Sequence, residues 1–136
     1  MAISARLVAT EIVEYLDGIT NVAAYLSEGP TPPVGKPVTV HPAAGQHDAP
    51  LGNPDRDLRV EFQTTCVGTT AEQALWVHDQ VATRLWRSAV TLDGSTNTLP
   101  IWAIPGTEQP VRRDDNLATP LFYVTCSWLA HARPTT

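Results

Sequence analysis

The spacing of apolar residues changes once in the middle of the chain. From Leu58 to Cys66 apolar and polar residues alternate, which is the pattern of a strand with one buried face. After Gly68 the apolar residues recur at every third or fourth position, as they do along one side of a helix. The pattern therefore predicts a strand followed at once by a helix that runs to about Arg87.

The predicted helix begins with a capping signature. Thr69 and Thr70 precede Glu72 and Gln73, respectively, by three residues. At this spacing a threonine hydroxyl accepts a hydrogen bond from a backbone N–H of the first turn, and the longer side chain reaches back toward the preceding N–H. We therefore expect the helix to start directly after the two threonines.

The helical wheel gives three aromatic residues of this helix different environments. The predicted apolar face comprises Ala71, Leu75, Ala82 and Leu85. His78 lies on this face, so we expect a hydrogen-bonded core or interface histidine rather than a catalytic base. Trp76 falls on the polar side with Arg87, where it is either covered by a loop of the same chain or contacts a partner. Trp86 lies at the edge of the apolar face and is expected in the core.

A second amphipathic helix is predicted near the N-terminus, over residues 4–17. Its apolar side is formed by Val8, Ile12, Tyr15 and Leu16. Ser4 is a suitable N-cap, and Gly18 is suited to end the helix in a left-handed conformation. Short strands are expected over 20–27 and 36–41, and either is a candidate sheet edge for pairing between subunits.

The remaining predicted elements are strands. Residues 90–92 and 98–104 flank the turn residues 93–95 of a hairpin, and 121–130 forms the longest strand. This last segment is apolar on both faces, which predicts a central or covered position. The element order α-β-β-β-α-β-β-β predicts an α+β fold, in which a mainly antiparallel sheet of about five to six strands carries two helices on one face.

The composition favours one domain that covers residues 1–136. Apolar residues make up 43% of the 136-residue chain and charged residues 17%, values typical of a globular protein. Most of the 12 prolines fall between the predicted elements, so we expect long, stiff loops over 29–37, 42–57 and 105–119. Such loops can reach adjacent subunits at a low ordering cost.

Charge and hydropathy argue against several classes of protein. A net charge of −5 leaves no basic footprint for wrapping nucleic acid. No apolar run approaches the roughly 20 residues of a membrane span, and the N-terminus lacks the basic head and apolar block of a signal peptide. We therefore expect no membrane partner and a chain that is made in the cytoplasm.

No group of side chains in the sequence forms an enzyme signature. His41, His47 and Asp48 are close together, but their spacing fits no established zinc pattern and their surroundings are rich in proline and glycine. Cys66 and Cys126 fall within predicted strands, where free thiols normally act as small core residues, although adjacent strands would allow them to pair. Phosphate-binding and nucleophile motifs are absent. We assign no catalytic, cofactor-binding or metal-binding residue.

One compact block of charge, RRDD, lies in the predicted loop 105–119. Its two acids beside two bases form either a solvated turn or an ion pair between subunits. This block and the polar side of the helix that starts after Thr70 supply the candidate contacts with partners. The candidate interface residues are Trp76, Arg87, Arg112, Arg113, Asp114 and Asp115.

The order of the elements resembles that of a known family. A helix, a proline-rich excursion, the strand RVEFQTTCVG, the helix TTAEQALWVHDQVATRLW, a hairpin, a loop with Pro-Gly and the final strand LFYVTCSWLA follow one another along nearly the whole chain. In this order and length the sequence resembles the tail-terminator (tail-completion, lambda minor tail protein U-like) proteins of long-tailed bacteriophages. The family has no invariant motif, so the resemblance carries over no residue roles.

The resemblance implies a structural virion protein without enzymatic activity or cofactors. Members of the family form a hexameric ring that caps the tail tube at its final length, stops its polymerisation and offers a surface to the neck of the head. DNA passes through the lumen of such a ring without specific binding. The implied partners are further copies of the chain, the tail tube protein and the head–tail connector or stopper protein. The implied location is the tail–neck region of a virion assembled in the host cytoplasm.

Two other interpretations fit the same pattern. One is another phage neck ring protein, such as a head-closure or head–tail joining protein, but these tend to be helix-rich or barrel-like. The other is a non-phage α+β module that binds a small ligand or a protein; a ligand site of this kind needs a deep pocket with convergent polar groups. Circular dichroism and a ring visible by electron microscopy would separate the three.

Overall fold

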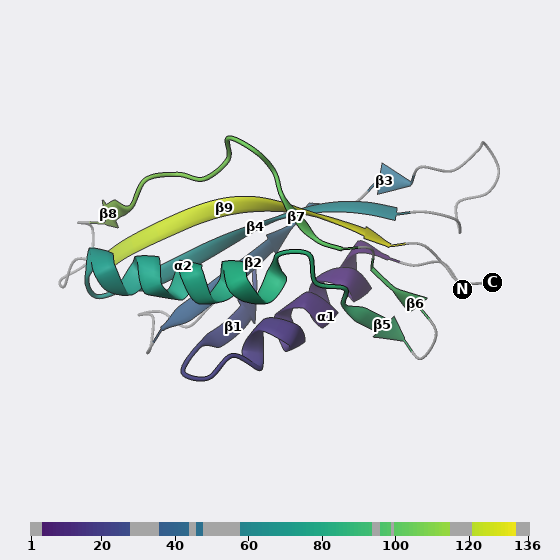
Figure 1. Ribbon diagram of the computed structural model, residues 1–136, viewed down its shortest axis with the longest axis horizontal. Helices are drawn as coiled ribbons and strands as arrows, with labels where there is room; N and C mark the ends of the chain where they lie inside the picture. The colour runs from purple at the N-terminus through teal and green to yellow at the C-terminus, as the bar shows by residue number, and fades with distance from the viewer. Residues whose placement is uncertain are drawn as a thin grey trace.

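The computed structural model places two helices against a sheet (Figure 1). It describes residues 4–27, 36–43, 46–47, 58–93, 96–98, 100–114 and 121–132. The helices in these ranges are α1 (Ala5–Asp17) and α2 (Ala71–Leu85). The strands are β1 (Ala23–Leu26), β2 (Pro37–Pro42), β3 (Gln46–His47), β4 (Leu58–Gly68), β5 (Thr91–Asp93), β6 (Thr96–Asn97), β7 (Trp102–Ala103), β8 (Arg112–Asp114) and β9 (Leu121–Ala132).

Seven of the strands in the described ranges form one sheet, with the order β1-β2-β4-β9-β7 across it. The other two strands of this sheet extend its inner pairings: β3 pairs with β4 beyond the end of β2, and β8 pairs with β9 beyond the end of β7. β1 and β2 run parallel, and the other strand pairs in the described residues are antiparallel. The structure therefore confirms the predicted α+β fold with a mainly antiparallel sheet.

The long pair of β4 and β9 forms the centre of this sheet. Its register joins Leu58 to Ala132 at one end and Gly68 to Phe122 at the other. The even-numbered residues of β4 are buried, and so are those of β9 from Val124 onward. Opposite residues of an antiparallel pair lie on the same face, so the two buried rows form one continuous surface. The central position predicted for the last strand is confirmed.

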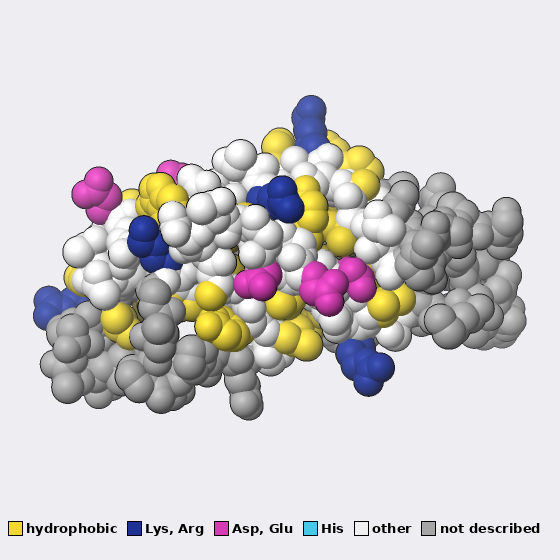
Figure 2. All heavy atoms as spheres, turned by 90° about the horizontal axis from the view of Figure 1, so that it is seen from below, with side chains coloured by type: hydrophobic (Ala, Val, Ile, Leu, Met, Phe, Trp, Pro, Cys, Tyr) yellow, Lys and Arg dark blue, Asp and Glu magenta, His cyan; other side chains and the backbone are white. Residues whose placement is uncertain are grey.

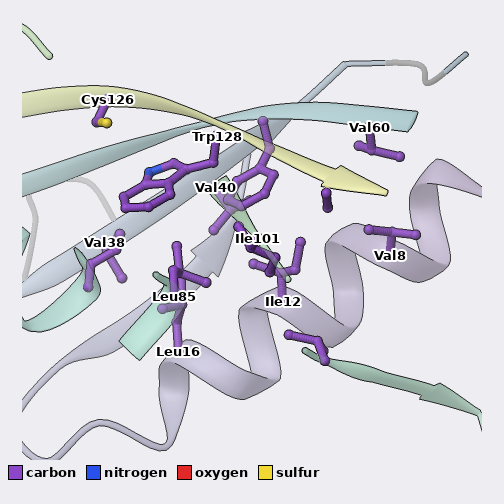
Figure 3. Packing of buried hydrophobic residues seen from close by; sticks show 14 of the residues in the cluster. Val8, Ile12, Leu16, Val38, Val40, Val60, Leu85, Ile101, Cys126 and Trp128 are labelled. Atoms are coloured by element: carbon purple, nitrogen blue, oxygen red, sulfur yellow. The ribbon is translucent and has the colours of Figure 1, made fainter. Parts of the chain in front are cut away.

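Both helices cover this buried face of the sheet (Figure 1). α1 buries Val8, Ala9, Ile12 and Leu16, and α2 buries Ala74, Val77, Val81 and Leu85. Figure 3 shows side chains of α1 directed toward the sheet, where Trp128 of β9 is the largest fully buried side chain. Tyr15, predicted on the apolar side of α1, is only half-buried, and the Arg84 guanidinium lies 4.1 Å from the centre of its ring.

The step from β4 to α2 takes two residues and is fixed by caps and by a glycine. Thr70 Oγ1 accepts a hydrogen bond from the Gln73 N–H at 3.1 Å, and Gln73 Oε1 accepts one from the Thr69 N–H at 2.7 Å. These bonds confirm the predicted capping signature. A Cβ atom at Gly68 would lie 2.5 Å from the backbone nitrogen of Ala74, so only glycine allows the helix to start this close to the strand.

This close approach also corrects the predicted apolar face of α2. Ala74, at the contact with Gly68, turns toward the sheet and is buried, whereas Leu75 is 45% exposed. The wheel had placed Leu75 on the apolar face, because periodicity alone does not say which of two neighbouring stripes meets the strand. The contact at the start of the helix sets its rotation.

The end of α1 differs from the prediction as well. Ser4 caps its start as expected, by accepting a hydrogen bond from the Leu7 N–H at 3.1 Å. Gly18, however, has a φ of −73° and continues the right-handed conformation, so the expected left-handed ending is wrong. The left-handed residue of this connection is Asn21, with a φ of 67°. Asparagine tolerates that region better than other side chains do, which explains the displaced turn.

Several short strands lie where the sequence predicted loops or longer strands. β3 falls inside the expected loop 42–57, β8 falls inside 105–119, and the expected strand 98–104 is reduced to β7. Each of these strands is held by pairing with β4 or β9. A strand of two or three residues is too short to show a periodic pattern, so the sequence could not predict it. The expected strand 36–41 corresponds to β2, which lies between β1 and β4 and so offers no free edge to another subunit. A hairpin lies at the predicted place, but its second arm is β6 and not the expected 98–104, so the hairpin is shorter than predicted. Residues 29–35 of the first expected loop lie outside the described residues.

One buried hydrogen-bonded group crosses the core. Thr64 of β4 is fully buried, and its Oγ1 accepts a hydrogen bond from Trp128 Nε1 at 3.0 Å. The same hydroxyl donates to the Cys126 carbonyl oxygen at 3.4 Å. Since a buried polar atom without a partner destabilises a fold, this hydroxyl both satisfies the indole N–H and fixes the orientation of the ring.

Thr64→Val should lower the free energy of unfolding by about 1–3 kcal/mol, because the buried indole of Trp128 loses its acceptor. Thr65→Val is the matched control, since the next residue faces the other side of the sheet; a change below about 0.5 kcal/mol is expected there. Urea unfolding followed by tryptophan fluorescence measures both. Adding Trp128→Phe removes the donor too, and the double variant should lose less than the sum of the two single losses. Equal losses at the two threonines would contradict the role of Thr64.

Candidate functional site

Two tryptophans form an exposed pair where α2 ends beside β7. Trp86 directly follows the last residue of α2, and Trp102 begins β7 at the edge of β9. The centroids of their rings lie 5.2 Å apart at an interplanar angle of 81°, an edge-to-face contact. The two residues are 44% and 46% exposed, so the core position expected for Trp86 is wrong. Tryptophan is enriched where proteins meet partners, and two in contact mark a candidate binding surface.

Arg87 completes this surface. Its guanidinium carbon lies 5.8 Å from the ring centroid of Trp86 and 5.3 Å from that of Trp102, which places the cation against both indoles. Its backbone N–H donates to the Ile101 carbonyl oxygen at 2.9 Å, and its φ is 58°. A left-handed conformation costs a residue other than glycine about 1–2 kcal/mol. We call Trp86, Arg87 and Trp102 the aromatic–arginine cluster.

A pocket of about 340 Å³ adjoins the cluster. It is lined by His78, Ala82, Trp86, Ala103, Pro105, Glu108, Cys126 and Trp128. Most of these side chains are apolar, but the buried Nδ1 of His78 has no hydrogen-bond partner in the structure as far as the chain is described. Sequence analysis placed His78 on the apolar face with a hydrogen bond, and this nitrogen lacks one.

The cysteines are free and are not poised for nucleophilic chemistry. Burial, and to a lesser extent Cys126, raises the pKa of the Cys66 thiol. Burial and the Glu108 carboxylate raise the pKa of Cys126, partly offset by a hydrogen bond with Thr107. Since the thiolate is the reactive form, both sulfurs act as small core groups, as the sequence favoured. The register places Cys66 opposite Val124, so the two cysteines are not directly paired across the strands.

Trp76, the tryptophan selected from the helical wheel, is 36% exposed in the middle of α2. The ammonium group of Lys36 lies 4.5 Å from the centre of its ring. The two residues line a shallow hollow of about 270 Å³ together with Thr70, Glu72 and Gln73. Trp76 thus has the ammonium group of Lys36 over its ring, and it lines a different hollow from the pocket beside Trp86.

The charged block expected in a loop forms an edge strand instead. Arg112, Arg113 and Asp114 make up β8 and pair with Tyr123, Phe122 and Leu121 of β9, respectively. Arg112 Nη2 also donates a hydrogen bond to Gln109 Oε1 at 3.3 Å. Of the two alternatives, the turn is wrong for these residues, because backbone pairing with the long strand orders them. The ion pair between subunits stays a prediction. Asp115, the fourth residue of the block, lies outside the described residues.

Two acids form a second charged feature, on α1. Glu11 and Glu14 lie one turn apart and their side chains share a hydrogen bond. Burial, the neighbouring Glu14 charge and this bond raise the pKa of Glu11. Figure 2 shows acidic side chains gathered in a short row on the side of the molecule where α1 lies. We call Glu11 and Glu14 the acidic pair.

Other kinds of site find no support in the part of the chain that is described. Within those ranges no group of three or more His, Cys, Asp or Glu side chains is arranged to hold a metal ion. None of the described helices has the length and apolar character to cross a membrane. His47 and Asp48, considered above as metal ligands with His41, have no described side-chain position.

Comparison with known proteins supports the fold. The structure resembles a chain from the solved structure "Virion of native gene transfer agent (GTA) particle", with a TM-score of 0.68. The match covers 93% of this chain and 94% of that chain, at 14% sequence identity. No protein-family model and no curated protein matches the sequence. The likeness is therefore one of architecture along nearly the full length of both chains.

Arg87→Gly should give a protein more stable than Arg87→Ala by about 1 kcal/mol. Both variants remove the guanidinium, but only glycine adopts the positive φ without strain. At Thr83, an exposed position inside α2, the order should reverse by about 1 kcal/mol, because alanine is the better helix former. Urea unfolding of the four variants tests this. Equal stability of the two Arg87 variants would show that the backbone there is not strained.

Glu11→Gln should raise the melting temperature at neutral pH. The pKa of Glu11 is raised in the folded protein, so its stabilising contribution is full at low pH and is lost as the pH rises through the folded pKa. The gain should shrink as the pH falls and vanish well below the ordinary pKa of 4.5, where the carboxyl is protonated in both states. Glu61→Gln, at an exposed position on the other face of the sheet, is the control. A lower melting temperature of Glu11→Gln at neutral pH would contradict the repulsion between the two acids.

Proposed function

We propose that the protein is a structural component of a phage-like virion. The observation that carries this proposal is the match along 93% of the chain to a chain from a gene transfer agent virion, with a TM-score of 0.68. The described surface supports a binding role over a catalytic one. Two exposed tryptophans on this surface contact each other and an arginine. The two cysteines of the chain, which could act as nucleophiles, are buried instead. Such a surface suits permanent contacts within an assembly.

More specifically, we propose a tail terminator: a ring, hexameric in the family that the sequence resembles, that caps the tail tube and stops its growth. The open sheet with two helices on one face supports this choice over the helix-rich or barrel-like architectures expected of head-closure and head–tail joining proteins. In this role one face of the ring contacts the tail tube protein and the other contacts the head–tail connector or stopper. The net charge of −5 suits a lumen that lets DNA pass without holding its phosphates.

Deletion of the gene from the genome that encodes the particle tests this role. We expect tail tubes of uncontrolled length that do not join heads, seen by negative-stain electron microscopy. Adding the purified protein to growing tubes should cap their ends and stop elongation, because a ring seated on the tube end blocks the addition of further tube subunits.

The result separates the neighbouring interpretations. Tubes of normal length that remain unattached to heads would indicate a head-closure or joining protein instead. Finished, infectious particles in the absence of the gene would exclude any structural role in the tail or neck.

A further inference from the structure

The edges of the sheet are poorly suited to pairing between copies of the chain. On β1, the Ala24 N–H donates to the Asp17 carboxylate at 3.2 Å and is therefore occupied by α1. On the opposite side, the outer strands β7 and β8 are two and three residues long. Between them, the backbone of β9 is satisfied by a side chain, since the Ser127 N–H donates to Thr107 Oγ1 at 3.2 Å. Short and partly covered edges of this kind limit strand addition, so side chains are better suited than strand edges to contacts between copies.

The aromatic–arginine cluster is the preorganised side-chain surface of the described chain. Trp86 and Trp102 brace each other, and the Arg87 backbone is tied to Ile101 next to β7. A surface that is already ordered loses little entropy when a partner binds. Tryptophan and arginine are also the residues that most often dominate binding energy.

Charge indicates what this cluster binds. The Arg87 guanidinium lies against the two indoles, and among the described residues no carboxylate pairs with it. The edge of a guanidinium carries the N–H donors that bind a carboxylate in a fork, and indole walls that exclude water strengthen such a pair. The best partner is therefore an acidic group that itself lacks a cation.

The acidic pair on α1 meets this requirement within the same sequence. Glu11 and Glu14 lie three residues apart on α1, so their carboxyl groups are neighbours on one side of the helix, and among the described residues neither forms an ion pair with a basic side chain. The chain thus carries one arginine and two acids without an ion-pair partner among the described residues. They lie on two separate surfaces of opposite charge, so one surface is complementary to the other.

We infer that the acidic pair of one copy docks on the aromatic–arginine cluster of the next copy. The contact uses two different surfaces, so each copy keeps one free cluster and one free acidic pair, and the contact can repeat until a ring closes. A symmetrical dimer would leave neither surface free. The inference rests on the proposed function, because it assumes that the protein assembles with copies of itself.

Charge reversal tests the contact. Arg87→Glu and Glu14→Arg should each weaken ring formation by at least about tenfold, since like charges then face each other across the contact. Assembly is measured by analytical ultracentrifugation and negative-stain imaging, in solution and on the ends of tail tubes. Circular dichroism confirms that each variant is folded. Assembly of the wild type should also weaken with added salt, because the pair is partly exposed.

Mixing the two variants gives the decisive arm. In a ring that alternates Arg87→Glu and Glu14→Arg subunits, opposite charges meet at every junction. At one kind of junction Glu14 meets Arg87, as in the wild type, and at the other the new arginine meets the new glutamate. Neither variant should assemble alone, whereas the mixture should. A mixture that stays monomeric while both variants are folded would overturn the inference.

A second comparison uses two exposed tryptophans of the same helical region. Trp86→Ala should disrupt the ring, whereas Trp76→Ala, outside the cluster, should assemble as the wild type does. If the wild type caps tubes and Arg87→Glu caps them equally well, the inferred contact is wrong and the proposed function stands. If the wild type neither forms rings nor binds tube ends, the proposed function and the inferred contact both fail.

Discussion

The antiparallel pairing of β4 with β9 determines the rest of the structure. Eleven residue pairs, from Leu58 with Ala132 to Gly68 with Phe122, place every buried side chain of both strands on one face. A slip of one residue would expose the core and bury the opposite row, so the register is strongly specified. The buried hydroxyl of Thr64 adds a directional bond to Trp128 inside that face. The helices, the core and the outer strands are all arranged around this pair.

Both central strands, β4 and β9, position the candidate site. α2 leaves β4 after two residues and is pressed against it at Gly68, so the start and rotation of the helix determine where its end brings Trp86 and Arg87. Trp102 is positioned by β9, because it belongs to β7, which pairs with β9. The cluster thus joins the end of the helix that follows one central strand to the edge of the other. Its geometry depends on the core although its side chains are exposed.

Local pattern predicted the elements that repeat a period and missed those that depend on distant contacts. The alternation in β4 and the caps at Ser4 and Thr70 were sufficient for the strand and for the helix starts. β3 and β8 exist only through pairing with the central strands, which no local period records. Trp86 was misplaced because it lies just past the end of α2, where the helical wheel no longer applies. Trp102 could be placed only once its pairing with Leu129 was known. Arg87 is exposed, as its place on the polar side of the helix predicted, but its contacts with two indoles were not predicted.

The conformation of Arg87 bears on whether this surface exists for folding or for binding. Its left-handed backbone favours glycine or asparagine, so the fold alone gives arginine no advantage at this position. A cation–π contact at an exposed site stabilises the protein by about 0.5–1 kcal/mol, so the two contacts of Arg87 at most offset the cost of its left-handed backbone. Asn21, which follows α1 and is also left-handed, is of the type that the backbone prefers. Strain at an exposed arginine held against two half-exposed tryptophans is therefore better explained by a partner that uses the guanidinium than by the stability of the free chain.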